Sequence, residues 1–351
     1  MNIMNTKFYK LYFLGLFLSF SLALTAGNPD RQGEAGASEL LMNPWAISSG
    51  FHSMNTASVS GVEAMRLNPA GLSRIGNGEF ILAHTQLYTG AELSMNAGGF
   101  ATKMGSNGTL GISLVSLNFG DIPITTTEQP EGTGGTYSPN FFNIGLGYSY
   151  LYDNTISVGV LVRGISEALP AVTAFGFAID AGVQYVSGEK DNFKLGISLR
   201  NTGSPMKFAG QGLSTNVAVG EGTLTLEQRS EDFELPSMLN LGISYDFYVS
   251  ETDYIRALGN FTSNAFSQDQ VGAGIEYSFR DIFQVRGSYK YNLGAGDTAF
   301  EDDIYTGVAA GFTARVPLSK ENKDRRLAID YAYRQTNPFK GTHNIGLRYI
   351  Y

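Results

Sequence analysis

The chain contains a single tryptophan, lacks cysteine and is poor in charged residues. The last two shortages each exclude a class of protein. Without cysteine it can form no disulfide, thiolate metal site, thiol nucleophile or lipid-modified N-terminal cysteine. Charged residues make up 16% of the 351 residues, below the ~25% of ordinary soluble proteins. The net charge of −8 gives no reason to expect nucleic acid as a partner. Intrinsic disorder is also excluded, because it needs high charge and few aromatics, whereas this chain has 19 Tyr and 23 Phe.

Long hydrophobic runs are scarce as well, and the one present lies at the N-terminus. Lys7 and Lys10 precede the apolar residues 11–24, and the small residue Ala26 follows as a cleavage site would. The run is too short to cross a bilayer as a helix, which takes about 20 residues. Residues 1–26 are therefore predicted to be a signal peptide, with a transmembrane anchor or a buried helix as the alternative. The exported chain is then either soluble outside the cytoplasm or a membrane β-barrel.

Glycine and a strict alternation of side chains dominate the remaining sequence. The 43 glycines are about one residue in eight, above the usual ~7%. From residue 79 onward, apolar residues alternate with small or polar ones, as in 142–150, which is the pattern of a strand with two different faces. The runs are about ten residues long with aromatics near their ends, as in transmembrane strands, whereas soluble strands average ~5–6 residues. A barrel lumen also accommodates the Gly, Ser, Asn and charges of the polar face.

Counting these runs gives a topology that can be checked against loop lengths. Fourteen strands are predicted near residues 79–89, 92–103, 108–119, 140–151, 154–165, 173–187, 192–201, 237–248, 253–264, 269–279, 282–291, 304–316, 325–334 and 342–351. Every long connection (120–139, 202–236 and 292–303) falls on one side of the barrel. Outer-membrane barrels have short periplasmic turns and long external loops. The predicted fold is therefore an all-β transmembrane antiparallel barrel of about 14 strands in residues 79–351, in the outer membrane with both termini periplasmic.

The two ends of the predicted barrel carry further signals. The last strand places an apolar or aromatic residue at alternate positions and ends on an aromatic, the pattern that outer-membrane assembly machinery reads: Ile345, Leu347, Tyr349 and Tyr351. Residues 27–78 lack alternation and contain short helical pieces at 38–42 and 62–67. The second piece stops at Asn68-Pro69-Ala70-Gly71-Leu72, because proline disfavours a helical Asn68 and Gly71 can take a positive φ. Residues 27–78 are predicted to be a plug in the lumen, a periplasmic tail being the alternative.

Catalytic and cofactor motifs are not found in the sequence. The three histidines (His52, His84 and His343) have no metal-ligand spacing, and His84 beside Thr85 is better explained as a lumen or interface residue than as part of a hydrolase. The acidic residues 301–303 lack the pattern of a calcium loop. Glycine-rich runs lie inside strands and not at a strand-to-helix turn, so no nucleotide loop is expected. We expect no enzyme, no cofactor and no metal.

The order of the glycine-rich blocks resembles that of a known family. Asn68-Pro69-Ala70-Gly71-Leu72 is followed by the blocks 142–148, 175–182 and 195–203 and by the closing strands 327–333 and 342–345. This arrangement is similar to the PorV/PorQ family of outer-membrane proteins, which is itself similar to FadL-type fatty-acid channels. The resemblance implies a 14-stranded outer-membrane barrel of Bacteroidota-type bacteria with a role in type IX secretion. PorV itself is expected to have Lys where Ala70 and Gly71 stand, which favours an unassigned paralogue.

Function is predicted chiefly from this resemblance. The leading hypothesis is a non-enzymatic barrel that binds type IX components, or exported proteins with C-terminal signal domains, through loops 120–139 and 202–236. Apolar residues of the second loop suit either a protein partner or a ligand vestibule, although the loop could also pack on itself: Met206, Phe208, Leu213, Leu224, Leu226 and Phe233. The alternative is a FadL-like channel for long-chain fatty acids or other small hydrophobic molecules. A purely structural porin is the third possibility, weakened because porins need no plug.

Overall fold

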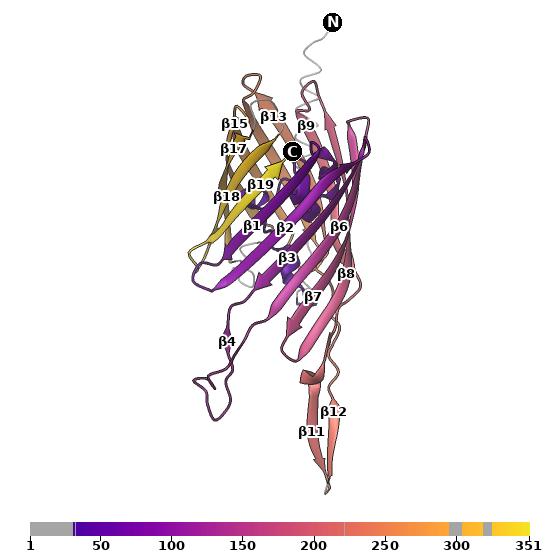
Figure 1. Cartoon of the computed structure of the whole chain (residues 1–351), viewed down its shortest axis with the longest axis vertical. Coiled ribbons are helices and arrows are strands. Elements are labelled where there is room, and N and C mark those ends of the chain that lie inside the picture. Colours follow the sequence, from indigo (N-terminus) through magenta and orange to yellow (C-terminus); the bar gives the residue numbers. More distant parts are fainter. Residues whose placement is uncertain (1–30, 32, 221, 295–303, 319–324) are drawn as a thin grey trace.

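The computed structural model describes residues 31, 33–220, 222–294, 304–318 and 325–351, which form a closed antiparallel β-barrel (Figure 1). Fourteen strands make the wall, and the first pairs with the last to close it. The predicted signal peptide (1–26) and the acidic residues 301–303 lie outside the described residues. None of the helices in the described part is long and apolar enough to cross a membrane.

The predicted strands are confirmed to within a few residues. The wall consists, in chain order, of β1 (Gly78–Leu87), β2 (Leu93–Met104), β3 (Gly108–Asn118), β6 (Asn140–Tyr152), β7 (Ile156–Leu169), β8 (Val172–Ser187), β9 (Phe193–Gly203), β13 (Met238–Tyr248), β14 (Tyr254–Asn264), β15 (Gln270–Phe279), β16 (Phe283–Asn292), β17 (Tyr305–Pro317), β18 (Arg326–Thr336) and β19 (Thr342–Ile350). Each strand pairs with its neighbour in the chain, so the topology is a simple up-and-down barrel.

The two faces of the wall follow the alternation of the sequence. Leu146 and Ile243 are 56% and 50% exposed on the outer surface, whereas the neighbouring Gly145 and Ser244 point inward and are buried. The same alternation of exposed apolar and buried polar residues runs along most of the strands. An apolar outside and a polar inside are what a membrane barrel requires, so the predicted facing is confirmed.

The long connections lie at one end of the barrel, here called the loop end, opposite the tight turns and Tyr351 at the tight-turn end (Figure 1). Two of them form hairpins of their own: β4 (Ile122–Pro123) with β5 (Thr136–Tyr137), and β11 (Ser214–Val219) with β12 (Gly222–Glu227). A short strand, β10 (Phe208–Ala209), pairs with β8, and the 3₁₀ turn η5 (Gln211–Leu213) leads into β11. The hairpin β11–β12 projects well beyond the wall (Figure 1).

Residues 33–77, here called the N-terminal segment, lie inside the barrel (Figure 1). The segment contains η2 (Ser38–Leu41), α2 (Ala46–Gly50), η3 (Gly61–Glu63), α3 (Ala64–Leu67) and η4 (Pro69–Arg74). Arg31, just before it, stands over the ring of Phe266 at the loop end. At the other end the backbone of Gly78 pairs with Tyr351. The chain therefore runs through the lumen from the loop end to the tight-turn end before it enters β1.

Candidate functional site

Inward-facing glycines of the wall make room for the N-terminal segment. A Cβ atom added to Gly159 would lie 2.2 Å from the carbonyl carbon of Pro69, and one added to Gly182 would lie 2.0 Å from Oδ1 of Asn68. Other inward glycines meet the segment at comparably short range: Gly99 at Val62, Gly196 at Thr56 and Gly272 at Met54. Separations of this size are too short for any side chain. Part of the glycine content of the polar face is thus explained by close contact with the segment.

The sequence Asn68–Leu72 docks the segment on β6, β7 and β8. The Asn68 side chain accepts a hydrogen bond from the Ala70 amide at 3.2 Å and donates to the carbonyls of Thr56 and Val183, both at 3.1 Å. Helix α3 ends at Leu67 as predicted, but the residues after it form the 3₁₀ helix η4. Gly71 has no positive φ, contrary to expectation. It is required instead because a Cβ there would lie 2.2 Å from the Val59 carbonyl oxygen.

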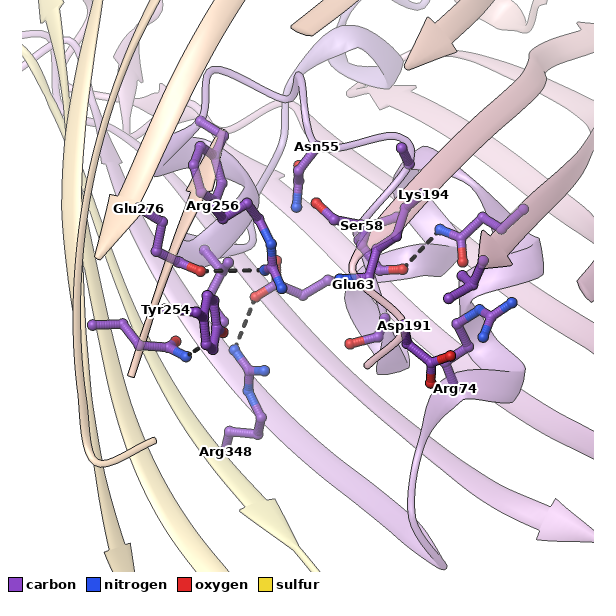
Figure 2. A pocket seen from close by; sticks show the side chains of 18 of the residues that line it. Asn55, Ser58, Glu63, Arg74, Asp191, Lys194, Tyr254, Arg256, Glu276 and Arg348 are labelled. Carbon is purple, nitrogen blue, oxygen red and sulfur yellow. Dashed lines mark hydrogen bonds and ion pairs between the residues drawn. The ribbon is translucent and has the colours of Figure 1, made fainter. Parts of the chain in front are cut away.

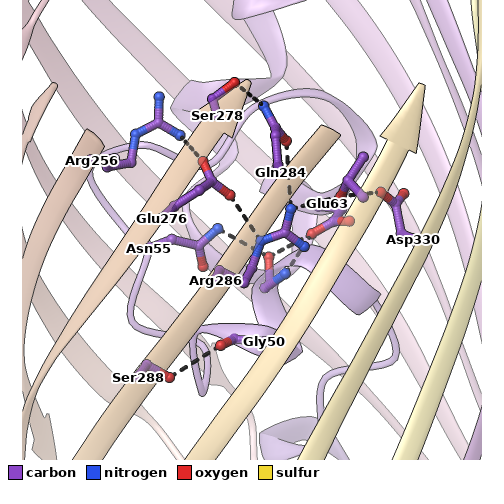
Figure 3. A network of polar contacts seen from close by, with 12 residues as sticks. Gly50, Asn55, Glu63, Arg256, Glu276, Ser278, Gln284, Arg286, Ser288 and Asp330 are labelled. Carbon is purple, nitrogen blue, oxygen red and sulfur yellow. Dashed lines mark hydrogen bonds and ion pairs between the residues drawn. The ribbon is translucent and has the colours of Figure 1, made fainter. Parts of the chain in front are cut away.

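A chain of charged side chains, linked at one point by a threonine, lines about half of the inner wall and ends on the segment; Figure 3 shows its middle part. Its members, in order around the wall, are Lys194, Asp246, Arg256, Glu276, Arg286, Thr313, Asp330, Arg348 and Glu63. Figure 3 shows Glu276 between Arg256 and Arg286, which it contacts at 3.2 and 2.8 Å. Buried charges require such pairing, because an isolated one is costly.

Glu63 joins this chain of charges to the N-terminal segment. One carboxylate oxygen accepts hydrogen bonds from the amide and hydroxyl of Ser48 at 3.0 and 2.6 Å. The other accepts from Arg348 of β19 at 3.2 Å. Burial raises the pKa of Glu63 above its usual value, and the positive charge of Arg348 opposes the rise. The segment is therefore tied to the wall by ionic contacts here and by the glycine contacts on several other strands.

A polar cavity of about 330 Å³ lies between the segment and the wall at the tight-turn end (Figure 2). Glu63, Lys194, Arg256, Glu276 and Arg348 line it, and all five take part in ion pairs. Figure 2 shows these charges converging from the segment and from several strands. A cavity with such a lining favours water over an apolar ligand.

A second cavity, of about 360 Å³, lies at the loop end, and we call it the loop-end cavity. It differs in chemistry, because methionines, leucine and tyrosines supply much of its surface: Leu41, Met42, Met54, Met238, Tyr88 and Tyr305. Its charged lining residues are all basic (Arg200, Lys290 and Arg334), and the described lining contains no Asp or Glu. Its size falls within the ~300–1,000 Å³ of ligand pockets. Neutral polar side chains complete the lining: Ser38, His52, Ser53, Asn240, Thr262, Asn264, Ser267 and Gln270. The cavity is therefore mixed, with an apolar part, a neutral polar part and a positive side.

Two arginines of this cavity keep unpaired donors. Arg200 and Arg334 are each only 4% exposed. Nε of Arg200, and Nε and Nη2 of Arg334, have no hydrogen-bond acceptor among the described residues. Arg334 stands 4.7 Å from the ring centre of Tyr305, and Arg200 donates to the Leu40 carbonyl at 3.3 Å. Leaving a buried charged donor unpaired costs upward of ~1–3 kcal/mol. The arrangement therefore suits an occupant that supplies negatively charged oxygen atoms.

His52 lies at the border of the loop-end cavity. Burial lowers the pKa of its imidazole well below the usual value, and the charges of Lys290 and Arg334 lower it further. The ring packs edge-on against Tyr305 with centroids 5.5 Å apart. His52 is therefore neutral at physiological pH and adds no charge to the cavity. The other two histidines lie in the wall, where His84 contacts Asn96 and His343 contacts Tyr331.

The predicted partner residues of loop 202–236 divide into two groups. Met206 is buried and Phe208 and Phe233 are half-buried, with the two phenylalanine rings 5.6 Å apart. Leu224 and Leu226 are exposed on the projecting hairpin, while the half-buried Leu213 lies in η5 at its base. Four of the six candidate residues are therefore buried or half-buried, and the two leucines of the projecting hairpin remain exposed.

The predicted assembly residues all lie at the C-terminal strand. Ile345 and Leu347 are exposed on the outer face of β19. The rings of Tyr349 and Tyr351 stack with centroids 5.7 Å apart. In the described residues no group of three His, Asp or Glu side chains could hold a metal ion.

The alternation of the sequence puts Arg200 and Arg334 on the polar faces of their strands, but it does not reveal the loop-end cavity. Its lining comes from the N-terminal segment and eight wall strands or their ends, so no local motif marks it. The one signal in the sequence that pointed to this cavity was the presence of arginine on the polar face near the ends of these two strands.

Comparison with known proteins identifies the fold but no sequence family. No family model matches the chain, and no curated protein matches it. Among solved structures, the TodX deltaS2S3 mutant monoaromatic hydrocarbon channel is similar with a TM-score of 0.56 and 14% identity, over 87% of this chain and 97% of that one. The CymD monoaromatic hydrocarbon channel gives 0.54 and 13%, over 89% and 98%. A Pseudomonas aeruginosa FadL homologue gives 0.50 and 11%, over 87% and 96%. The chain thus has a FadL-like barrel fold.

Proposed function

We propose that the protein is an outer-membrane channel for small hydrophobic molecules, including those with an anionic group, which it binds in the loop-end cavity. The observation that carries this proposal is that the apolar part of the cavity lining lies beside Arg200 and Arg334, whose buried nitrogens lack acceptors among the described residues. The apolar surface would bind the body of the ligand and the arginines its carboxylate. The FadL-like fold, shared with solved hydrocarbon channels, supports the same class of function. The channel is non-enzymatic in this proposal.

The proposed orientation follows from the same features. The long loops face the outside, and the tight turns and Tyr351 face the periplasm, as in other outer-membrane barrels. The ligand then enters at the loop-end cavity, and the N-terminal segment lies between it and the polar tight-turn cavity. Transport therefore requires part of the segment to move, because its contacts with the glycines leave no space for a hydrocarbon chain.

Ligand binding to the purified full-length protein tests the proposal. Palmitate binding should weaken about tenfold or more in Arg200→Met and in Arg334→Met, because one charge-assisted contact is lost. Methyl palmitate should bind the wild-type protein weakly and be insensitive to both substitutions. Arg326→Met, at the tight-turn end, is the matched control and should bind palmitate like the wild type. Equal palmitate binding in all four proteins would contradict the proposal.

Partner binding is a second candidate, favoured by the projecting hairpin β11–β12. Its Leu224 and Leu226 are 52% and 45% exposed, and a two-stranded hairpin is marginally stable alone in water. The resemblance to PorV/PorQ suggests type IX secretion components or exported proteins with C-terminal signal domains as partners. Crosslinking in native outer membranes tests this. Those proteins should be recovered with the full chain and lost when residues 212–228 are replaced by a short glycine-serine linker. Equal recovery with both would reject the hairpin as the binding element.

A further inference from the structure

The polar cavity at the tight-turn end, here called the tight-turn cavity, plays no part in the ligand site proposed above. Its volume of about 330 Å³ far exceeds what one water molecule needs and lies within the ~300–1,000 Å³ of small-molecule pockets. The N-terminal segment supplies Asn55, Ser58 and Glu63 to its lining, and the wall supplies Gln184 and Arg348. Figure 2 shows side chains of the segment and of the wall pointing into the same space. A molecule bound here would therefore contact segment and wall together.

The charges of the tight-turn cavity are balanced, unlike those of the loop-end cavity. Four of the five basic residues in its described lining form ion pairs: Lys194 and Arg256 with Asp246, Arg315 with Asp281, and Arg348 with Asp330 and Glu63. The fifth, Arg74, donates to the Thr155 carbonyl at 3.1 Å, and the exposed Asp191 of the same lining lies beside it (Figure 2). A ligand with a net charge would have to displace one of these partners, which is costly in a buried site. The cavity therefore favours a neutral ligand.

The lining nevertheless offers hydrogen bonds of both kinds. Oδ1 of Asn55 and Oε1 of Gln184 have no donor among the described residues, and Nε of Arg348 has no acceptor there. The Nε2 atom of Gln184 donates to the carbonyls of Thr56 and Val59 at 3.1 and 2.9 Å, which fixes the amide so that its oxygen is the atom left over. Neutral polar side chains make up much of the remaining lining: Ser58, Ser60, Tyr254 and Gln284.

The paired charges can also bind hydroxyl groups. Arg348 uses one nitrogen, Nη2, for both Asp330 and Glu63, at 2.6 and 3.2 Å. A guanidinium has five N–H donors, and an ionised carboxylate accepts at about four positions. A hydroxyl group can therefore accept from the guanidinium, or donate to a carboxylate, without breaking the ion pair. A molecule with several hydroxyl groups matches this lining better than a charged or an apolar molecule does.

We propose that the tight-turn cavity is a binding site for a neutral, polyhydroxylated molecule of monosaccharide size. The molecule enters from the tight-turn end, where the exposed Ser60 and Asp191 form part of the lining. Its hydroxyl groups bond to Asn55, Tyr254 and Arg348. The proposal does not rest on the proposed function, because it concerns a different class of molecule in a different cavity.

Thiol labelling of the full-length protein tests whether the cavity is occupied. Because the chain has no cysteine, one introduced thiol reports on each cavity. Ser58 and Ser53 are half-buried serines of the N-terminal segment, and Ser58 lines the tight-turn cavity whereas Ser53 lines the loop-end cavity. In a detergent without a sugar headgroup, D-glucose should slow the labelling of Ser58→Cys in a saturable way and leave that of Ser53→Cys unchanged. An unchanged labelling rate of Ser58→Cys, or equal protection of both variants, would overturn the proposal.

Titration calorimetry tests the class of ligand and the residues that bind it. D-glucose should bind the wild-type protein at one site, whereas gluconate and glucosamine, which carry opposite charges, should bind about tenfold more weakly. Asn55→Ala and Tyr254→Phe should each weaken glucose binding by about five- to tenfold, because each removes one hydrogen-bonding group. Asn260→Ala is the matched control: Asn260 is also buried, and its Oδ1 also lacks a donor among the described residues, but it lines neither cavity.

Two results of the calorimetry would overturn the proposal: tighter binding of gluconate or glucosamine than of glucose, or the same glucose affinity in Asn55→Ala, Tyr254→Phe and Asn260→Ala. Palmitate binding without any glucose binding would reject this site and leave the proposed function standing. Glucose binding without palmitate binding would do the reverse.

Discussion

At the scale of single residues, the inner face of the wall is shaped by what lies against it. Gly159 and Gly182 meet the backbone and side chain of Asn68–Pro69 at distances no Cβ could share. Arg200 and Arg334, in contrast, border open space and keep donors unpaired. The inner face therefore holds the N-terminal segment tightly where inward glycines meet it and leaves room for an occupant beside the two arginines.

The glycine contacts predict a clear difference between two alanine substitutions on one strand. Gly159→Ala should destabilise the protein by about 1–3 kcal/mol, because the added methyl group collides with Pro69. Gly164→Ala is the matched control on β7: its Cβ would lie 3.5 Å from Ile144, an ordinary contact. Urea unfolding in detergent measures both. Equal stability of the two variants would show that the segment does not rest on the wall as described.

His52 predicts a specific pH dependence. The pKa of His52 is lowered in the folded protein, whereas an unfolded histidine titrates near ~6.5. As the pH falls through ~6.5, the unfolded chain gains a proton that the folded protein does not accept. Above pH ~6.5 the difference in proton binding leaves the free energy of unfolding unchanged. Below that pH it lowers the free energy of unfolding by at most ~1.4 kcal/mol per pH unit.

His52→Gln should remove this contribution. Unfolding free energies measured at pH 7 and pH 5 should therefore differ less in the variant than in the wild type. Carboxyl groups titrate in both proteins, so their effect cancels in the comparison. The same pH difference in both would mean that His52 is not held neutral.

At the scale of elements, the sequence predicted the features that depend on neighbouring residues and missed those that depend on long-range contacts. Strand boundaries follow from alternation, which neighbouring residues carry by themselves. The end of α3 followed from Pro69, a local constraint. The role of Gly71 was misjudged, because the group it must accommodate is Val59, brought close only by the folded segment. Likewise Met206 and Phe233 pack beside a segment some 170 to 200 residues earlier in the chain, which no periodicity reveals.

The facing of the strands predicts how arginine substitutions divide. Leu146→Arg or Ile243→Arg places a charge on the outer face and should cost ~2–4 kcal/mol near the membrane midplane. Ser244→Arg, on the inner face of the same strand as Ile243, should cost less because its charge stays in the polar lumen. Gly145→Arg should mainly crowd Leu161 and Met65. Heat-modifiability gels report the assembled fraction, and equal tolerance on both faces would mean that the facing is wrong.

At the scale of the whole molecule, the barrel consists of a rigid wall and a polypeptide threaded through it. The segment separates the loop-end cavity, whose lining is part apolar and whose charged residues are basic, from the polar, ion-paired cavity at the tight-turn end. The barrel and its loop asymmetry could be predicted from the sequence, since both follow from strand count and connection length. The two cavities could not, because each is assembled from residues of many strands together with the segment.

The conductance of the reconstituted barrel tests the central claim, that residues 33–77 occupy the lumen, most directly. In planar bilayers the full-length protein should show little steady conductance, because the segment fills the lumen. Deletion of residues 27–77 should leave a heat-modifiable barrel whose conductance is much larger, as expected for a water-filled 14-stranded wall. Gly164→Ala serves as a reference variant that should conduct like the wild type. A deleted barrel that folds and conducts no better than the full-length protein would contradict the account.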